Sequence, residues 1–482
     1  MAALPRCCSK RLPNVPTSSR RRADNEAVKD PPLRSGATTT NVDSFPVGTA
    51  MLLASLTFAV LRQGAYHQWQ HQVFAWLVLG SAVLLVLVRS CRPALATAAV
   101  IVAPLFLSTA VSSVLSDDRT DARSTFLQIL LVGVGLAAGA AIPEQRRITL
   151  LHGFLMIAMI VAATAVYGVA AHSAPWGRIT AGVWRGSSSL TYSNAAAAVL
   201  GPGALLTFGL AARSTSRGYP VVAAALAVAL ISTQSRAGIA ATALVGLWLI
   251  RRQGARGFAE TALPILAGVI IGIPLLLVYA SDAKDPQPAI VLVTIIVGLG
   301  VTAVAWPWRT RIRHPVMAVG GLAFSGLVLA TITGMASSLG QRLTLRSGTT
   351  AQGEDASVLF GDRGREWSTA WDQFMERPVV GHGPGVVNLT WTEDGRSFRA
   401  LFVHNEYLEY AVTNGAVGLA ALALSAMLFL RFRSANTPDV AVLFVIAGYL
   451  LHSGFDYLWH LPALPVLFAV VAGTQLRRSV KR

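Results

Sequence analysis

The sequence predicts an all-α polytopic integral membrane protein with about 12 to 14 transmembrane helices and one large extracytoplasmic loop. Of its 482 residues, 53% are hydrophobic and only 13% are charged, whereas soluble domains carry about 25% charged residues. The formal net charge of +17 comes from basic residues in short clusters between apolar runs, a pattern that indicates membrane topology. We therefore expect the lipid bilayer as a partner of this chain, and no nucleic acid.

Residues 1–46 are polar and rich in Arg, Ser, Thr and Pro, which predicts a disordered basic cytoplasmic tail and not a signal peptide. Residues 47–338 and 411–476 hold apolar runs that are long enough for helices across a roughly 30 Å hydrocarbon core. The predicted helices, eleven in the first stretch and three in the second, cover residues 47–61, 73–88, 94–115, 125–142, 149–171, 190–212, 219–232, 237–250, 258–280, 287–306, 315–338, 411–430, 438–455 and 462–476. The shortest of them, 47–61, 219–232 and 237–250, could instead be half-helices or re-entrant segments.

The distribution of basic residues predicts the orientation of these helices. The short loops on one side of the membrane carry fourteen arginines, and those on the other side carry seven basic residues. The positive-inside rule therefore places both termini, including the basic tail 477–482, in the cytoplasm of a plasma-membrane protein. It places the one long polar segment, residues 339–410, outside. A loop of this length is usually functional, and Glu366 to Met375 could form a helix within it.

Several common catalytic signatures are missing, because the chain has no Walker A loop, HExxH, GxSxG or strand-linked GxGxxG motif. His67 and His71 have the i,i+4 spacing of a metal pair, but no third ligand is near, so we interpret them as interfacial residues. The three cysteines have no spacing typical of disulfides or zinc sites. We therefore expect no metal and no cofactor.

The remaining candidates lie on the predicted outer face. His404, at the entrance to a helix, can exchange a proton near neutral pH, or it is simply interfacial. Arg236 lies at the edge of the hydrocarbon, where it either binds an anion or extends its side chain to water. Arg363 and Arg365 could bind phosphate oxygens in pairs or belong to the solvated surface. The Gly-rich run 378–385 indicates a tight bend, with anion binding by its backbone as the alternative.

Five segments in this order resemble the O-antigen ligase and O-antigen polymerase (Wzy_C-type) family of membrane glycosyltransferases. They are Thr191-Tyr192-Ser193-Asn194, Ser235-Arg236-Ala237-Gly238, Arg363-x3-Trp367, Pro378-Val-Val-Gly381-His-Gly383-Pro-Gly385 and His404-Asn405-x9-Gly415-x-x-Gly418-Leu419. A weaker similarity follows at His452-Ser-Gly-Phe-Asp456. The resemblance covers about residues 185–475, and the Gly415–Gly418 pair would let another helix approach closely.

The resemblance implies a GT-C-like architecture and a glycosyltransferase of surface polysaccharide biosynthesis. Its donor would be a polyprenyl-diphosphate-linked glycan, and its acceptor a hydroxyl of a glycan or lipid-glycan at the outer face of the plasma membrane. It implies that His404 activates the acceptor hydroxyl and that Arg236 and Arg363 hold the diphosphate. Four more residues in or beside these segments complete the predicted substrate-binding set: Arg185, Asn194, Arg365 and Asn405.

Because the outer face offers arginines and no obvious carboxylate cage, we expect a metal-independent, inverting transfer. The sequence does not decide between a ligase and a polymerase, because both share these segments. The alternative is a transporter or flippase of a polyprenyl-linked sugar or another anion. Transporters typically contain inverted repeats with broken helices, and we find no matching halves in this sequence.

Overall fold

The computed structural model describes residues 47–88, 91–116, 120–180, 182–322, 363–385, 387–393, 396–434 and 440–476. The α-helices in these ranges are α1 (Val47–Leu61), α2 (Gln68–Leu87), α3 (Arg92–Leu115), α4 (Ala122–Ala141), α5 (Arg147–Ala170), α6 (Ser193–Ala211), α7 (Gly218–Ser232), α8 (Arg236–Gln253), α9 (Ala255–Tyr279), α10 (Pro288–Ala305), α14 (Arg363–Glu376), α15 (Glu406–Phe432), α16 (Val440–Ser453) and α17 (Ala463–Gly473). Short 3-10 helices include η1 (Gln63–Ala65), η3 (Glu144–Arg146), η4 (Trp306–Arg311) and η5 (Leu458–His460). The predicted tails 1–46 and 477–482, and residues 339–362 of the predicted loop, lie outside the described residues.

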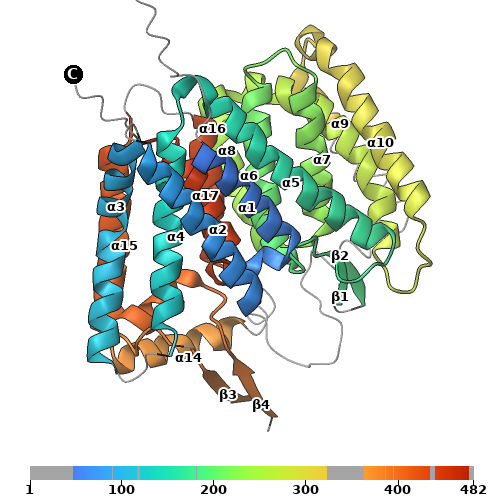
Figure 1. Cartoon of the computed structure of the whole chain (residues 1–482). Helices are drawn as coiled ribbons and strands as arrows, with labels where there is room; N and C mark the ends of the chain where they lie inside the picture. Colours follow the sequence, from blue (N-terminus) through green and yellow to red (C-terminus); the bar gives the residue numbers. More distant parts are fainter. Residues whose placement is uncertain are drawn as a thin grey trace, which may run out of the picture. The chain divides into compact units, whose positions relative to one another are not determined.

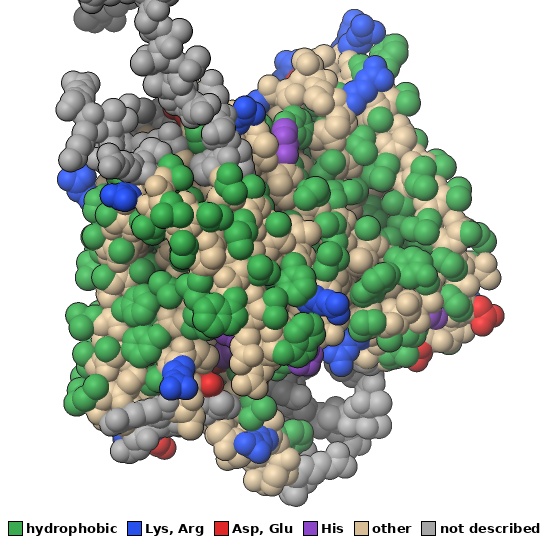
Figure 2. Space-filling view, in the orientation of Figure 1, with side chains coloured by type: hydrophobic (Ala, Val, Ile, Leu, Met, Phe, Trp, Pro, Cys, Tyr) green, Lys and Arg blue, Asp and Glu red, His purple; other side chains and the backbone are tan. Residues whose placement is uncertain are grey.

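Apart from the eleventh, each of the predicted membrane segments overlaps a described helix, which confirms an all-α polytopic membrane protein (Figure 1). The eleventh is described only over residues 315–322. Within the described residues, eight helices are long and apolar enough to cross a membrane, and α1, α7, α16 and α17 are shorter apolar helices. Hydrophobic side chains cover the middle of the face shown in Figure 2, with many of the Lys and Arg side chains toward its two ends. This distribution is expected where a bilayer surrounds the helices.

The loops that we predict to share one side of the membrane meet at one end of the helices. The Gln63 main-chain N–H donates to the Ser189 carbonyl oxygen at 3.2 Å, and that of Asp121 donates to the Pro384 carbonyl oxygen at 2.9 Å. α14 and the two β-hairpins lie at this same end (Figure 1). Because segments far apart in the sequence meet here, this end of the molecule can bring together side chains from several loops.

Two small antiparallel hairpins depart from the all-α expectation. β1 (Gly177–Thr180) pairs with β2 (Val183–Gly186), and β3 (Leu389–Glu393) pairs with β4 (Arg396–Ala400). Hydropathy gave no sign of them, because four or five residues between longer apolar runs hardly alter a helix-length average. β2 packs close to α5 and α7, since a Cβ at Gly186 would lie 2.7 Å from the Ser232 hydroxyl and 3.0 Å from the Ala165 carbonyl oxygen.

Candidate active site

Asp456 is a buried carboxylate in the connection between α16 and α17. Its exposed fraction is 0%, and it accepts hydrogen bonds from the Tyr192 hydroxyl at 2.5 Å and from Asn194 Nδ2. Arg363 Nη2 donates to Asp456 Oδ2 at 3.2 Å, and Nη1 donates to the Phe455 carbonyl oxygen at 2.7 Å. A buried carboxylate is tolerated only when it is paired and hydrogen-bonded. Asp456 therefore fixes the first residue of α14 against this connection.

Arg185, in β2, joins the same cluster through Asn194. Its Nη2 donates to Asn194 Oδ1 at 3.2 Å, and its Nε donates to the Thr233 carbonyl oxygen at 2.9 Å. Arg236 is the first residue of α8 and is exposed. The Ser235 side chain caps this helix. The turn between α7 and α8 thus places Arg236 beside the residues that hold Arg185.

Arg185, Arg236 and Arg363 gather positive charge around Asp456. Burial lowers the pKa of Arg185. Tyr192 and Asp456 oppose this shift, and the charges of Arg363 and Arg236 add to it. Because arginine stays protonated in proteins, these last two contributions mean that Arg363 and Arg236 each repel the guanidinium group of Arg185. A bound anion would relieve this repulsion, and guanidinium groups match phosphate oxygens in geometry. We name these three residues the arginine cluster.

Burial, together with the charge of Asp456, raises the pKa of Tyr192 well above its usual value. The phenol therefore keeps its proton and acts as a hydrogen-bond donor to the carboxylate. Asn194 is buried between Arg185 and Asp456, and its Nδ2 also donates to the Tyr192 hydroxyl at 3.0 Å. Both polar ends of Asn194 are therefore engaged within the protein, so it orients Arg185.

His404 lies just before α15 and is held by α14. Its Nδ1 is 2.8 Å from Glu366 Oε2, and its main-chain N–H donates to the other oxygen of Glu366. The Glu366 side chain is 5% exposed and that of His404 29%. A carboxylate that accepts the Nδ1–H bond selects the tautomer in which Nε2 is basic. No described residue forms a hydrogen bond with Nε2, so this nitrogen can accept a proton from a bound hydroxyl.

The pattern of α14 explains why Glu366 faces inward. Glu366 and Ala370, four residues apart, are the buried residues of this helix, and such residues share one helical face. Ala370 packs with Val403 and Val412 in a small apolar cluster. Trp367 Nε1 donates to the His404 carbonyl oxygen at 3.2 Å. Packing of this face thus places the Glu366 carboxylate beside His404.

Tyr457 lies between the arginine cluster and His404. Its ring stacks on that of Tyr192, with 4.9 Å between centroids, and the His404 ring meets it edge-on at 4.8 Å. Burial raises the pKa of Tyr457, so its phenol is neutral. Asp456 precedes it directly. Tyr192, which neighbours the arginine cluster, and the His404 ring therefore contact one aromatic side chain.

The Gly-rich run packs into a break in α15. Gly381 and Gly415 both have positive φ, at 72° and 65°. A Cβ at Gly415 would lie 2.3 Å from the Val379 carbonyl oxygen, and one at Gly381 would lie 2.5 Å from that of Thr413. Only glycine combines this backbone conformation with such a close approach. Our expectation of a helix approaching Gly415 is therefore corrected, because a loop approaches it and fixes the end of α14 to α15.

The other sequence candidates lie at less central positions. Arg365 is exposed, whereas Arg363 of the same helix faces Asp456. The Asn405 side-chain oxygen accepts the main-chain N–H groups of residues 407 and 408 and so caps α15. His67 caps α2, and the described residues contain no group of three or more possible metal ligands that includes His67 or His71.

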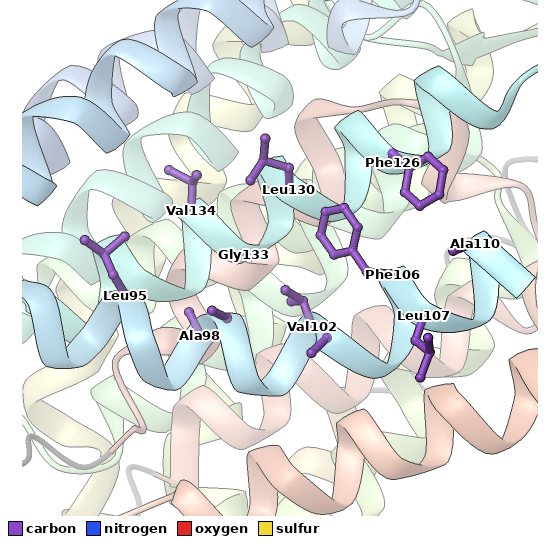
Figure 3. A pocket seen from close by; sticks show the side chains of 12 residues that line it. Leu95, Ala98, Val102, Phe106, Leu107, Ala110, Phe126, Leu130, Gly133 and Val134 are labelled. Carbon is purple, nitrogen blue, oxygen red and sulfur yellow. The ribbon is translucent and has the colours of Figure 1, made fainter.

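A groove of about 580 Å³ between α3 and α4 is lined only by apolar residues (Figure 3). Its lining includes Ala98, Val102 and Phe106 from α3 and Phe126, Leu130 and Gly133 from α4. These side chains carry no group that transfers protons or binds phosphate, so the groove is not the site of the reaction. Its lining suits a hydrocarbon chain.

Sequence reasoning missed the carboxylates of this site. Asp456 appeared only as a weak similarity, and Glu366 only as part of a predicted helix. A signal was present for both: Glu366 lies three residues after Arg363 and one before Trp367, on the face that packs inward, and Asp456 is an acid among aromatic residues between two apolar helices. Burial of such acids requires partners.

The family model described as O-antigen ligase (Wzy_C) matches residues 288–423. The match runs from the start of α10 into α15 and includes Arg363, Glu366 and His404, while Arg185, Asn194 and Arg236 lie outside it. No curated protein matches the chain in a sequence comparison. The match confirms the resemblance drawn from the sequence segments. The chain is therefore a multi-pass membrane protein whose residues 288–423 match the O-antigen ligase family model.

Proposed function

We propose that this protein transfers a preassembled glycan from a polyprenyl diphosphate carrier to an acceptor hydroxyl. The matched domain supports an O-antigen ligase-type glycosyltransferase in general. The observation that carries the finer proposal is the placement of His404, held by buried Glu366, across the Tyr457 ring from the arginine cluster. Transfer from a sugar diphosphate requires a base close to a phosphate-binding region.

In the proposed step, His404 Nε2 accepts the proton of the acceptor hydroxyl as its oxygen attacks the anomeric carbon. The bond between that carbon and the phosphate oxygen breaks, and its electron pair stays on the polyprenyl diphosphate that leaves. The glycan is thereby joined to the acceptor by a glycosidic bond with inversion. Glu366 stabilises the imidazolium that forms, because it accepts the Nδ1–H bond.

The arginine cluster would neutralise the charge that develops on the leaving diphosphate. Arg363 and Arg185 are both held by buried partners, so they need not reorganise when the bond breaks. Removal of one such preorganised donor commonly costs about 100- to 1,000-fold in rate. Arg236 is exposed at the start of α8 and would complete the cluster when the donor binds.

We place the reaction at the outer face of the plasma membrane, with both termini in the cytoplasm. This orientation rests on the positive-inside rule and on the loops that meet at one end of the helices. The donor would reach the site from the bilayer, and the apolar groove between α3 and α4 offers a surface for lipid chains. Described parts of the predicted outer loop, α14 and β3–β4, lie at the same end (Figure 1).

The experiment that tests this function incubates the purified, detergent-solubilised protein with a polyprenyl-diphosphate oligosaccharide and resolves the products by size. A ladder of repeats would establish a polymerase, and a single transfer that needs an added acceptor would establish a ligase. The His404→Ala variant should lose about 1,000-fold in rate while its donor dissociation constant stays the same. Undiminished product from His404→Ala would contradict the mechanism. Movement of labelled donor across vesicles without any transfer would instead support the transporter alternative.

A further inference from the structure

Glu409 and His460 form an ion pair that the reaction described above does not use. Glu409 lies in the first turn of α15, and His460 ends η5. His460 Nε2 is 2.5 Å from Glu409 Oε1, and the exposed fractions of the two side chains are 29% and 9%. The other oxygen of Glu409 accepts the main-chain N–H of Val403 at 2.7 Å. Val403 directly precedes His404, so the pair is connected to the catalytic histidine by one peptide bond.

Ring contacts add a second connection to His404. The His460 and Phe402 ring centroids are 4.1 Å apart. Phe402 stacks on Tyr457 at 5.4 Å, and Tyr457 contacts the His404 ring at 4.8 Å. The segment before α15 is therefore held from two sides, by the Glu409 carboxylate on its backbone and by His460 on its aromatic side chain.

Acidic groups on two neighbouring elements determine the charge of His460. Burial alone would lower its pKa, but Glu409, Glu406 and Asp121 more than offset this and raise the pKa of His460 to about 9. Glu406 and Glu409 belong to α15, and Asp121 precedes α4. The neutral phenol of Tyr457 faces His460 from its own connection, with 6.4 Å between ring centroids. His460 is therefore protonated at neutral pH.

Because the pKa of His460 is raised by folding, the sign of its pH dependence follows. The contribution of His460 to the free energy of unfolding is complete below the ordinary histidine pKa of about 6.5 and is lost as the pH rises through about 9. Above that pH, the largely buried Glu409 would face a neutral imidazole instead of a cation. Leaving one member of such a pair unpaired is costly, so the segment before α15 should loosen.

We infer that the Glu409–His460 pair positions His404: protonated His460 holds Glu409, Glu409 holds the backbone of Val403, and the His404 ring thereby stays beside Tyr457 and the arginine cluster. The inference rests on the proposed function, because it assigns the pair a role in that reaction. Neither residue touches the reacting atoms, so both are positioning residues. Their loss should lower kcat and leave donor binding unchanged.

The test compares His460→Gln with the control variant His152→Gln. His152 lies near the start of α5, where its Nε2 contacts the Tyr219 hydroxyl at 3.0 Å. We expect His460→Gln to lower kcat about tenfold at pH 7.5, with the donor dissociation constant unchanged. The wild-type decline in kcat near pH 9 should disappear in this variant. The inference is overturned if kcat stays within about twofold of wild type, if His152→Gln loses as much, or if the decline near pH 9 persists in His460→Gln.

A readout without activity separates this inference from the proposed function. The melting temperature of the wild type in detergent should fall as the pH rises through about 9, and Glu409→Gln and His460→Gln should flatten this fall. A protein that shows this difference but transfers no glycan would overturn the proposed function and leave the ion pair standing. An active protein whose melting temperature follows the same pH course in wild type and variants would overturn the inference.

Discussion

The residues on the two sides of Tyr457 differ in their balance of positive and negative charge. On the arginine side, the buried carboxylate of Asp456 pairs with Arg363, and Arg185 and Arg236 add two further positive charges nearby. On the histidine side, which comprises His404, Glu366 and the Glu409–His460 pair, each histidine has a carboxylate within 2.8 Å. Positive charge is thus in excess on one side, whereas every histidine on the other side contacts a carboxylate.

From this difference we expect the arginine side, and not the histidine side, to bind an anionic ligand. Arg363 is held by Asp456 and Arg185 by Asn194, and we expect an anion to balance their excess positive charge when it binds. The histidine side is already complete, so it can orient its base before the acceptor arrives. Variants on the arginine side should therefore change donor binding as well as kcat, and variants on the histidine side should change kcat alone.

After His404→Ala, the largest effect is expected from Glu366→Gln. The amide can still accept the main-chain N–H bond of His404, but it cannot stabilise the imidazolium that forms on the ring. We expect kcat to fall about 100-fold, with the donor dissociation constant unchanged. Steady-state kinetics together with a direct donor-binding titration measure the two quantities separately. A fall in donor affinity of the same size would show that Glu366 does not belong to the histidine side alone.

The sequence predicted the parts of this arrangement that depend on local patterns. The helices follow from apolar runs, and α14 (Arg363–Glu376) confirms the helix expected over Glu366 to Met375. The positions of Asp456 and Glu366 could not be predicted, because their partners are 264 and 38 residues away in the sequence. A single sequence carries no signal that connects Tyr192 with Asp456. The pairing emerges only when the connections between helices meet at one end.

A smaller effect is expected from Arg363→Lys on the arginine side. Lysine keeps the charge, but a single ammonium nitrogen replaces the planar fork whose two nitrogens donate to Asp456 and to the Phe455 carbonyl oxygen. We expect the donor dissociation constant to rise about tenfold and kcat to change less. Binding of inorganic diphosphate, followed by calorimetry, should weaken in parallel. If kcat falls while diphosphate binding stays the same, Arg363 acts on the histidine side and the division at Tyr457 is wrong.

The smallest effect is expected from Arg365→Ala, which tests how far the arginine side extends. Arg365 is two residues from Arg363, about 200° around a helix with 3.6 residues per turn, and it is exposed. Its charge therefore acts on a bound diphosphate mainly through water, where salt screens it. We expect the donor dissociation constant to change less than about twofold at 0.15 M salt. A loss as large as that of Arg363→Lys would mean that the donor contacts the exposed face of α14 as well, and that the excess positive charge around Asp456 is only part of the anion-binding surface.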